Sequence, residues 1–397
     1  MISVENAFER IMGKLTPLPT ERMELSACSG RVLASPIRAR RSQPGCNVSA
    51  MDGYALRSAD LEGKTTNFKL VGESAAGTPC QTGVGAGEAV RIFTGAAVPE
   101  GADQVVIQEN TGPIDDGIFT DEASKAGKNI RLAGNDFAES QVVLEAGSYL
   151  SARSLGLAAS AGHSHLMVYR VPTIALLATG DELVAPDKKE FLPFETVNST
   201  VPQLQAMLAE IGVSAIDLGQ AGDTVKGLRT AIRKSGNADI LVTIGGASVG
   251  DRDFMQEALQ AEGMKLDFWK VNMKPGKPLI YGKRGEQHVL GMPGNPVSAF
   301  VCALLFLRPL VDGLMGRPAP FPGGVMMPVA TALEKNGPRQ HYMRARLIGE
   351  PGSRHVDPAV SQDSSQLSVL AQCDGLIVRP PEAATAEAGS LVPFLPF

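Results

Sequence analysis

Apolar and polar positions change their spacing several times along this chain of 397 residues. Val4, Phe8, Ile11 and Met12 recur at helical spacing, so the sequence predicts an amphipathic helix at the start, ended by TPLPT. Residues 43–136 alternate short β-like runs such as AVRIF with turns rich in Gly and Pro, which is typical of a mostly β region. Ala-rich sequence compatible with a helix then returns in SARSLGLAASAG.

A βα alternation begins at Pro172. PTIALLAT, SAIDLG and ADILVTIGG have the pattern of strands, and an amphipathic helical stretch follows each of them. LDFWKV, PLIYG and HVLGM predict further strands before a long helix in NPVSAFVCALLFLRPLVDGL. This alternation predicts an α/β fold with a doubly wound, mostly parallel sheet, whose ligands bind beyond the carboxyl ends of the strands. From about Ala319, short strands between Pro and Gly turns predict a small β barrel or sandwich.

Composition narrows the class of protein. An apolar content of 44% and a charged content of 20% indicate a soluble globular protein, and the length predicts two to four domains. A net charge of −5 without a long basic tract disfavours a nucleic-acid partner. The run VSAFVCALLFL is too short to span a membrane and predicts a buried helix. MISVENAFERIMGK has no secretory pattern, and the five cysteines form no CxxC, which disfavours a structural zinc site and a disulfide framework. We therefore expect a cytoplasmic protein with no membrane partner.

The stretch TIGGASVGDRDF follows a predicted strand and precedes a helix. Gly245, Gly246 and Gly250 would let backbone amides approach an anion, and the helix start adds partial positive charge. A plain βα turn is the competing interpretation. Asp251 and Asp253 follow at once, and either could cap the helix.

The stretch FWKVNMKPGKPLIYG places Lys270, Lys274 and Lys277 around a Pro-Gly turn. Three cations this close repel one another unless they face solvent or a multiply charged anion. A solvated strand end explains one such lysine more readily than three. Because lysine is a flexible point charge suited to phosphate or another oxyanion, we predict an oxyanion site at this turn.

Further candidates lie at predicted strand ends and turns. GMPGNPVSAF puts Gly294 and Asn295 directly before a helix, which is a second anion site unless it is ordinary helix initiation. Glu182 of ATGDELV follows the first strand of the βα region, the usual address of a functional acid. Asp223 has a comparable position, although N-capping is the simpler explanation for it. NVSAMDGYAL has no clear period, and its plainest interpretation is a hairpin turn centred on Asp52 and Gly53.

Oxyanion-binding elements thus accompany carboxylates that are typical of a metal site. These acids are Asp52, Glu182, Asp223, Asp251 and Asp253. The combination implies a bridging divalent cation, and Mg²⁺ commonly uses one or two carboxylates with water and substrate phosphates. No Ser-His-Asp or Cys-His set stands out. Positioning and electrostatics on a phosphorylated substrate are therefore favoured over covalent catalysis.

A series of motifs occurs here in the same order as in the MoeA family: SAMDGYA, RIFTGAAVPEGAD, IRLAGNDF, TGDEL, GGASVGDRD, WKVNMKPGKP and GMPGNPVS. Over nearly its whole length the chain resembles these molybdopterin molybdenumtransferases, which include the E domain of gephyrin. The resemblance implies an elongated subunit in four parts. They are a discontinuous helical domain (1–42 with 137–168), a β-rich insertion (43–136), a doubly wound domain similar to molybdopterin adenylyltransferase (169–318) and a C-terminal β barrel (319–397).

The resemblance also implies a homodimer, with its cleft between the doubly wound domain of one subunit and parts of the other. Family members take adenylylated molybdopterin and molybdate, hydrolyse the adenylate with Mg²⁺ and insert molybdenum into the dithiolene, giving molybdenum cofactor and AMP. Molybdate and the pyrophosphate link are both oxyanions, which fits the excess of anion-binding elements. Molybdopterin adenylyltransferase and molybdoenzyme maturation factors are the expected partners.

Site residues follow from the matching motifs, position by position. The implied catalytic residues are Asp52, Glu182, Asp223, Asp253, Lys270 and Lys274. Glu182, Asp223 and Asp253 would bind the metal, and Asp52 would come from the partner subunit. The implied substrate-binding residues are Thr94, Asp136, Gly245, Gly246, Ser248, Gly250, Lys277, Pro278, Gly294, Asn295, Arg339 and Ser364.

A molybdate pocket is implied by a subset of these positions: Lys274, Lys277, Pro278, Arg339 and Ser364. The C-terminal sequence QDSSQLSVLAQCDGL departs from the family pattern, which has Gly after the Gln and Ala-Asn near the end. Asp363 puts a negative charge where molybdate would approach.

Two other functions stay open. A molybdopterin adenylyltransferase-type activity would use the shared doubly wound domain, but the extra domains and SAMDGYA disfavour it. A non-catalytic scaffold, as gephyrin's E domain is for membrane receptors, is disfavoured because nothing in the sequence resembles a linker or companion domain.

Overall fold

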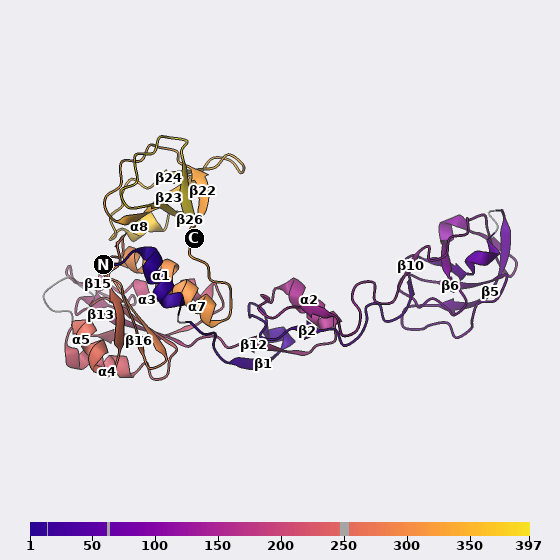
Figure 1. Cartoon of the computed structure of the whole chain (residues 1–397), viewed down its shortest axis with the longest axis horizontal. Coiled ribbons are helices and arrows are strands. Elements are labelled where there is room, and N and C mark those ends of the chain that lie inside the picture. The colour runs from indigo at the N-terminus through magenta and orange to yellow at the C-terminus, as the bar shows by residue number, and fades with distance from the viewer. Residues whose placement is uncertain (14, 62–63, 247–253) are drawn as a thin grey trace. The chain divides into compact units, whose positions relative to one another are not determined.

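The computed structural model describes residues 1–13, 15–61, 64–246 and 254–397, and Figure 1 shows their helices and strands. The chain forms two compact units. The first contains Met1–Glu21 and Tyr169–Phe397, and the second contains Arg22–Val168. The two boundaries fall in β1 (Thr20–Glu24) and β12 (His165–Tyr169), which pair with each other. The division into four parts stays a prediction, since contacts separate only these two units.

The first unit is built on a sheet of six strands in the order β16-β13-β17-β21-β20-β18. Their bounds are β13 Ile174–Thr179, β16 Ala215–Ala221, β17 Ile240–Ile244, β18 Lys265–Trp269, β20 Ile280–Arg284 and β21 Gln287–Met292. The strands from β16 to β21 pair in parallel, whereas β20 and β18 add antiparallel pairs. The predicted mostly parallel sheet is confirmed. Every residue of β13 and β17 is buried, which explains their continuous apolar runs.

Helices cover both faces of this sheet. They are α3 (Thr200–Ala209), α4 (Val225–Arg233), α5 (Phe254–Ala261), and α6 (Pro296–Cys302) and α7 (Arg308–Leu314) joined by a π-helical segment (Ala303–Leu307). Alternate residues of β13 enter different cores: Leu176 packs in the cluster that contains α3, α6 and α7 residues, and Leu177 in the one with α4 and α5 residues. A strand that contributes to two cores requires cover on both sides, so the sheet is doubly wound.

The opening helix α1 (Val4–Met12) is also confirmed, with Ser3 accepting a hydrogen bond from the backbone N–H of Asn6 as N-cap. Its apolar face lies in the same core as the α3 and α7 residues, with Phe8 in edge contact with Phe321. The first 21 residues therefore pack with the doubly wound domain, which differs from their expected grouping with 137–168. The physical reason is that the apolar stripe of α1 is buried there.

The long helix over Pro296–Leu314 is buried as predicted. Among the described residues it is the one helix long and apolar enough to cross a membrane, but 78% of its most apolar window is buried inside the protein. This burial is that of a core helix.

The C-terminal segment forms a second six-stranded sheet in the first unit, with the order β19-β23-β25-β26-β22 and β24 paired to β23. Its elements are β19 Met273–Lys274, β22 Val325–Pro328, β23 Gln340–Ile348, β24 His355–Pro358, β25 Gly375–Arg379, β26 Leu391–Pro396 and the short helix α8 Leu367–Leu370. Strand β19 comes from the lysine-rich turn, so this turn is an edge strand of the C-terminal sheet.

The second unit is rich in β structure, as predicted. Its main sheet has the order β7-β4-β6-β5-β9-β8. The bounds are β4 Gly53–Leu56, β5 Thr66–Ser74, β6 Glu88–Ile92, β7 Gln104–Ile107, β8 Gly112–Ile114 and β9 Gly117–Thr120. Outside it lie the pairs β2 (Ile37–Arg38) with β11 (Val142–Leu144) and β3 (Val48–Ser49) with β10 (Ile130–Arg131), and helix α2 (Ala152–Ser160).

The hairpin interpretation of MDGY is wrong. Strand β4, which begins at Gly53, pairs with β6 and β7, and the preceding strand β3 pairs with β10. The backbone at Asp52 is therefore a bend between two sheets. A side chain at Gly53 would lie 2.0 Å from the carbonyl oxygen of Val106, so this position requires glycine.

Candidate active site

Four candidate residues lie at one edge of the doubly wound sheet. Glu182 follows β13, Asp223 follows β16, Gly245 follows β17 and Gly294 follows β21. These four strands are neighbours and parallel, so all four residues lie at carboxyl strand ends. This edge is where ligands bind in such sheets.

A cavity of about 480 Å³ opens at this edge. Among its lining residues are seven that the sequence predicted: Glu182, Asp223, Gly245, Gly246, Pro278, Gly294 and Asn295. The size is that of a typical small-molecule site. The structure thus brings these seven predicted residues together around one cavity.

The glycine loop follows directly from β17. Gly245 and Gly246 have φ angles of 91° and 70°, a region that favours glycine. A Cβ at Gly245 would lie 2.6 Å from the carbonyl oxygen of Thr179 on the neighbouring strand. At Gly294 a Cβ would lie 3.5 Å from the Gly245 Cα atom, so the two loops approach backbone to backbone. Only small residues leave the cavity open here.

The acidic residues of the cavity repel one another. Burial, followed by the charges of Asp181 and Glu182, raises the pKa of Asp223 above its usual range. The Asp181 carboxylate accepts a 3.4 Å hydrogen bond from the Asp223 backbone N–H. The N-cap of α4 is Thr224, whose hydroxyl accepts from the N–H of Gly227, so the N-capping interpretation of Asp223 is wrong. Asp223 is free to serve the cavity.

The predicted metal ligands are represented here by Glu182 and Asp223, which share the cavity. Asp253 lies outside the described residues, as do Ser248, Gly250 and Asp251. Within the described part of the chain, no cluster of three or more His, Cys, Asp or Glu side chains has a metal-binding arrangement. The two carboxylates that are present still suit Mg²⁺, which often takes one or two protein carboxylates. The pKa of Asp223 is raised by burial and then by the neighbouring charges of Asp181 and Glu182, and a cation would compensate both effects.

The second helix start joins the cavity to the C-terminal domain. Asn295 is the N-cap of α6 and makes no side-chain bond to the helix. Its Nδ2 instead donates a 3.0 Å hydrogen bond to the hydroxyl oxygen of Ser364. The predicted substrate-binding residues Asn295 and Ser364 are thus in direct contact.

The lysine turn is not gathered on the cavity. Of its predicted residues, Pro278 is the one found among the described lining residues. The ammonium of Lys270 lies 3.6 Å from the centroid of the Trp269 ring, a cation–π contact. Lys274 is exposed on β19, and Lys277 is half-buried. The expectation that three lysines converge on one anion is not met within the described lining.

Lys274 is instead placed beside the basic C-terminal sheet. It pairs with His341 across β19 and β23. Burial, followed by the charges of Lys274 and Arg339, lowers the pKa of His341 to about 4. Lys274 and Arg339 therefore act on the same locality, as the molybdate-pocket hypothesis requires.

The charge of Asp363 is met locally. Its Oδ1 atom accepts hydrogen bonds of 2.9 Å from both the backbone N–H and the hydroxyl of Ser365, and these bonds lower its pKa. Its backbone carbonyl accepts from the buried Arg344. The carboxylate is thus engaged in its own turn, and the neighbouring Ser364 is left to Asn295.

The remaining predicted residues belong to the second unit. The Oδ1 atom of Asp52 accepts hydrogen bonds from the backbone N–H of Thr94 at 2.7 Å and from its hydroxyl at 2.8 Å. These bonds, the backbone one first, lower the pKa of Asp52, which is fully ionised at neutral pH. Asp136 is exposed, and its backbone N–H donates to the carbonyl of Gln43. Asp52 and Thr94 thus form one local pair.

Sequence reasoning missed a polar wall of the cavity. It consists of Thr179, Thr196, Asn198, Ser199 and Thr200. Most of it lies in the run TVNST, which spans β15 (Thr196–Val197) and the first residue of α3 and whose NST part the sequence predicted as the polar start of a helix. The available signal was that this polar run directly precedes a predicted helix in the same strand-to-helix connection as the motif TGDEL.

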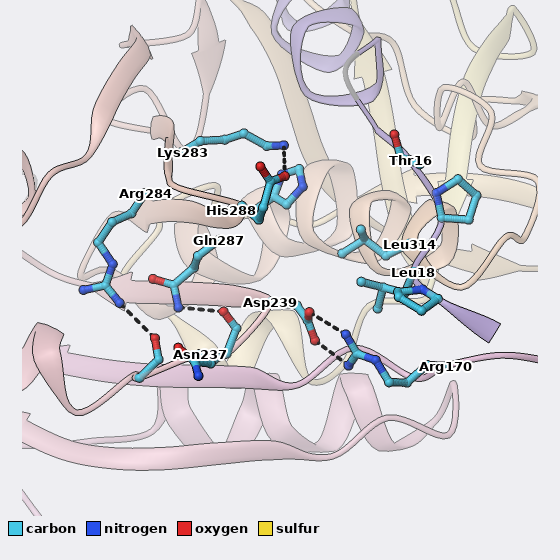
Figure 2. Close-up of a pocket in the computed structure, with 15 residues that line it drawn as sticks. Thr16, Leu18, Arg170, Asn237, Asp239, Lys283, Arg284, Gln287, His288 and Leu314 are labelled. Carbon is cyan, nitrogen blue, oxygen red and sulfur yellow. Dashed lines mark hydrogen bonds and ion pairs between the residues drawn. The ribbon is translucent and has the colours of Figure 1, made fainter. Parts of the chain in front are cut away.

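A second cavity, of about 450 Å³, lies at the opposite, amino ends of the strands (Figure 2). Figure 2 shows the Arg170 guanidinium facing both carboxylate oxygens of Asp239, with two bonds of 2.8 Å. Arg284 donates to the Ser235 hydroxyl at 2.7 Å. Because these charged groups already have partners within the protein, we interpret them as structural. The Arg170–Asp239 ion pair anchors the residue that directly precedes β17.

Comparison with known proteins agrees with this geometry. The sequence matches the MoeA N-terminal region (domain I and II) over residues 2–162, the probable molybdopterin binding domain over 175–313 and the MoeA C-terminal region (domain IV) over 327–397. A molybdopterin molybdenumtransferase of Haemophilus influenzae is 35% identical over 404 residues, covering 100% of this chain and 99% of the relative.

The chain belongs to the MoeA family.

A second MoeA relative, the molybdopterin molybdenumtransferase of a Nostoc species, is 33% identical and covers 91% of this chain and 85% of its own length. Among solved structures, a MoeA protein described as from Pyrococcus horikosii has a TM-score of 0.86 at 23% identity, with coverage of 100% of this chain and 99% of that one. This match shows the MoeA fold over the whole chain.

Proposed function

We propose that this chain inserts molybdenum into adenylylated molybdopterin, with Mg²⁺-dependent hydrolysis of the adenylate, and releases molybdenum cofactor and AMP. The observation that carries the proposal is the shared cavity at the carboxyl strand ends, where Glu182 and Asp223 face the loops of Gly245 and Gly294. Acids and anion-binding backbone in one cavity suit a phosphate ester that is bound together with a cation. The names of the MoeA relatives, both molybdopterin molybdenumtransferases, support the molybdenum-transfer part of this reaction.

Glu182 and Asp223 would hold Mg²⁺, with Asp253 as the third predicted ligand. When bound, the cation neutralises phosphate oxygens and polarises the phosphorus for attack. The protein's share is to present both carboxylates to the same cavity. Burial and then the charges of Asp181 and Glu182 raise the pKa of Asp223, and a bound cation would offset both effects by stabilising the ionised carboxylate.

The glycine loops would bind the pyrophosphate link of the substrate. The backbone N–H of Gly245 donates to the carbonyl of Met292 at 3.0 Å and braces the loop, while the backbone at Gly246 can approach phosphate oxygens because no Cβ intervenes. A water molecule attacks one phosphorus atom, the P–O bond of the anhydride breaks, and AMP leaves with the bridging oxygen or the water oxygen according to the phosphorus attacked. The polar wall around Asn198 and Ser199 can hold the substrate in line for this attack.

Molybdate would bind on the side of the lysine turn. Lys274 and Arg339 supply positive charge, and Ser364 supplies a hydroxyl beside Asn295. The two dithiol sulfurs form two Mo–S bonds, one oxo ligand leaves molybdate, and it departs as water with the two thiol protons. No redox change is needed, since molybdenum stays hexavalent.

A turnover assay tests the proposal. Purified chain, adenylylated molybdopterin, molybdate and Mg²⁺ should give AMP and active cofactor in equal amounts, and EDTA should stop AMP release. Robust adenylylation of molybdopterin with ATP by the chain alone would contradict it and favour the adenylyltransferase alternative. Binding of a receptor peptide without any AMP release would favour a scaffold.

A homodimer is part of the proposal, with Asp52 and Thr94 acting on the cavity of a second copy. Mixing two inactive variants tests this arrangement. If Asp52→Asn and Glu182→Gln subunits are co-expressed, half of the dimers are mixed and each has one intact site, so about a quarter of wild-type activity should return. No recovery above the unmixed variants would contradict action between subunits.

A further inference from the structure

Arg91 occupies an unusual position in the sheet of the second unit. It lies on β6, directly opposite Tyr54 of β4 in the antiparallel ladder. Its guanidinium carbon is 5.0 Å from the centroid of the Tyr54 ring and 4.8 Å from that of the Phe93 ring. Two aromatic rings therefore hold the planar cation, which restricts its rotamers and lowers the entropy lost when it forms hydrogen bonds.

The donors of Arg91 are directed at the turn that bears Asp52. Nη1 donates a 2.9 Å hydrogen bond to the carbonyl oxygen of Gly53, the residue directly after Asp52. Nη2 donates a 2.8 Å bond to Oε1 of Gln108. The backbone N–H of Gln108 in turn donates to the carbonyl of Asp52 at 3.2 Å. Arg91 and Gln108 thus hold the two peptide groups that flank Gly53, through the carbonyls of Asp52 and Gly53.

The carboxylate of Asp52 is held from the other side by Thr94, three residues after Arg91. The chain segment 91–94 therefore fixes the backbone of this turn through Arg91 and the direction of its carboxylate through Thr94. Within the described part of the chain, Arg91 has no carboxylate within ion-pair distance, although its charge is among the influences that lower the pKa of Asp52. Neutral acceptors alone would not require a cation.

We infer that Arg91 is a positioning residue for Asp52: it fixes the Asp52–Gly53 turn through Gly53 and Gln108 and keeps its positive charge beside the carboxylate. The inference rests on the proposed role of Asp52 in the reaction. It assigns Arg91 no contact with substrate. Its loss should therefore slow turnover without weakening substrate binding.

The test compares variants of the full-length protein in the AMP-release assay. Arg91→Met should lower kcat by roughly 10- to 100-fold and change KM for adenylylated molybdopterin by less than about threefold. Arg91→Lys keeps the charge and can keep one hydrogen bond, so its kcat should lie between those of Arg91→Met and wild type. Gln108→Leu should lower kcat by about three- to tenfold, and combined with Arg91→Met it should add little, because both act on one turn.

A matched control is Arg57→Met. Arg57 lies just after β4 in the same unit, pairs at 3.8 Å with Asp60 and does not contact the Asp52 turn. It removes the same charge and should leave kcat within about twofold of wild type. The melting temperature of each Arg91 and Gln108 variant should lie within a few degrees of that of the Arg57→Met control.

Chemical rescue separates positioning from a merely structural role. Arg91→Ala leaves a slot between the Tyr54 and Phe93 rings, and millimolar guanidinium should restore part of kcat, whereas equal sodium chloride should not. An Arg91→Met variant with wild-type kcat beside an inactive Asp52→Asn variant would overturn the inference alone. A fully active Asp52→Asn variant would overturn the role of Asp52 in the proposed function. Loss of kcat only in proportion to unfolded protein, without rescue, would also overturn the inference.

Discussion

The side-chain amide of Asn295 donates a 3.0 Å hydrogen bond to the hydroxyl of Ser364. Asn295 begins the long core helix, and Ser364 lies 69 residues later in the C-terminal domain. This bond connects the cavity lined by Glu182 and Asp223 to the C-terminal domain, where Arg339 directly precedes β23. The two reactions proposed for the chain, adenylate hydrolysis and molybdenum insertion, would meet at this contact.

Ser364→Ala should separate these two reactions. Loss of the hydroxyl removes one exposed hydrogen bond, so the free energy of unfolding should change by no more than about 1 kcal/mol. The molybdate concentration for half-maximal insertion should rise several-fold, while AMP release at saturating molybdate stays near wild type. Titration of molybdate with both products followed checks this, and an unchanged requirement would remove Ser364 from the oxyanion site.

Glu182→Gln and Asp223→Asn should each reduce AMP release by at least about 100-fold, because each removes a carboxylate proposed to hold Mg²⁺. Far-UV circular dichroism should be unchanged, since neither residue is among the buried residues of a core. Asp187→Asn is the matched control: it is an exposed acid in the same loop region and does not line the cavity. Full activity of either cavity variant with Mg²⁺ present would refute the metal-site assignment.

Asp223→Asn should also stabilise the fold in metal-free buffer. The pKa of Asp223 in the folded chain is raised above its ordinary value of 3.8. At a pH between 3.8 and this raised pKa, the folded chain binds more protons than the unfolded chain. Stability is therefore lost as pH rises through this window, and the loss persists at neutral pH. The variant lacks this cost, so its melting temperature with EDTA should exceed that of wild type at pH 7. The difference should vanish below pH 3.8.

Lys274→Ala should raise the molybdate requirement and should also change His341. The Lys274 charge is one cause of the lowered pKa of His341, so this pKa should move up from about 4 in the variant. NMR titration of the His341 ring protons measures that shift directly. A molybdate requirement equal to that of wild type, with His341 shifted as expected, would show that Lys274 lies near the site without serving it.

His288 should make the protein sensitive to mild acid. Burial, followed by the charge of Lys283, lowers its pKa from 6.5 to about 4, and its Nδ1 is hydrogen-bonded to the Tyr281 hydroxyl at 2.9 Å. As the pH falls between these two values, the unfolded chain binds a proton at His288 that the folded chain does not. The free energy of unfolding therefore decreases by up to about 3 kcal/mol.

The double variant Tyr281→Phe/His288→Leu tests this sensitivity without leaving a buried hydroxyl unpaired. Chemical denaturation between pH 7 and pH 4 should show a shallower loss of stability than in wild type. The part due to His341, whose pKa is lowered to about 4 in the same way, should remain. An identical slope in both proteins would contradict the neutral state of His288.

The sequence predicted the doubly wound sheet well because parallel strands that are buried on both faces consist of nearly continuous apolar residues. IALLAT of β13 and ILVTI of β17 are completely buried and were both recognised. Glu182 and Gly245 follow these strands directly, so their common address at the sheet edge could be inferred from the order of elements. Local pattern and tertiary position coincide in this part of the chain.

Other features depend on contacts between distant segments and left no local pattern. The bend at Asp52 resembles a hairpin in sequence because Asp-Gly is a strong signal for a hairpin turn, and only the pairing of β4 with β6 and β7 decides against it. Thr224 and Asp223 are both good caps, and geometry alone selects Thr224. The dispersal of the lysines likewise reflects the pairing of Lys274 with β23, 67 positions further along the chain.

Strand β19 limits how this protein can be divided. Met273 and Lys274 lie between two strands of the doubly wound sheet but find their ladder partners at Gln340 and His341. The side-chain amide of Asn272 also donates to the backbone carbonyl of Pro338. A fragment ending before residue 319 would keep the whole glycine-loop cavity yet leave this edge without its neighbour. Domain exchange between MoeA relatives should therefore succeed only when the lysine turn and the C-terminal sheet are inherited together.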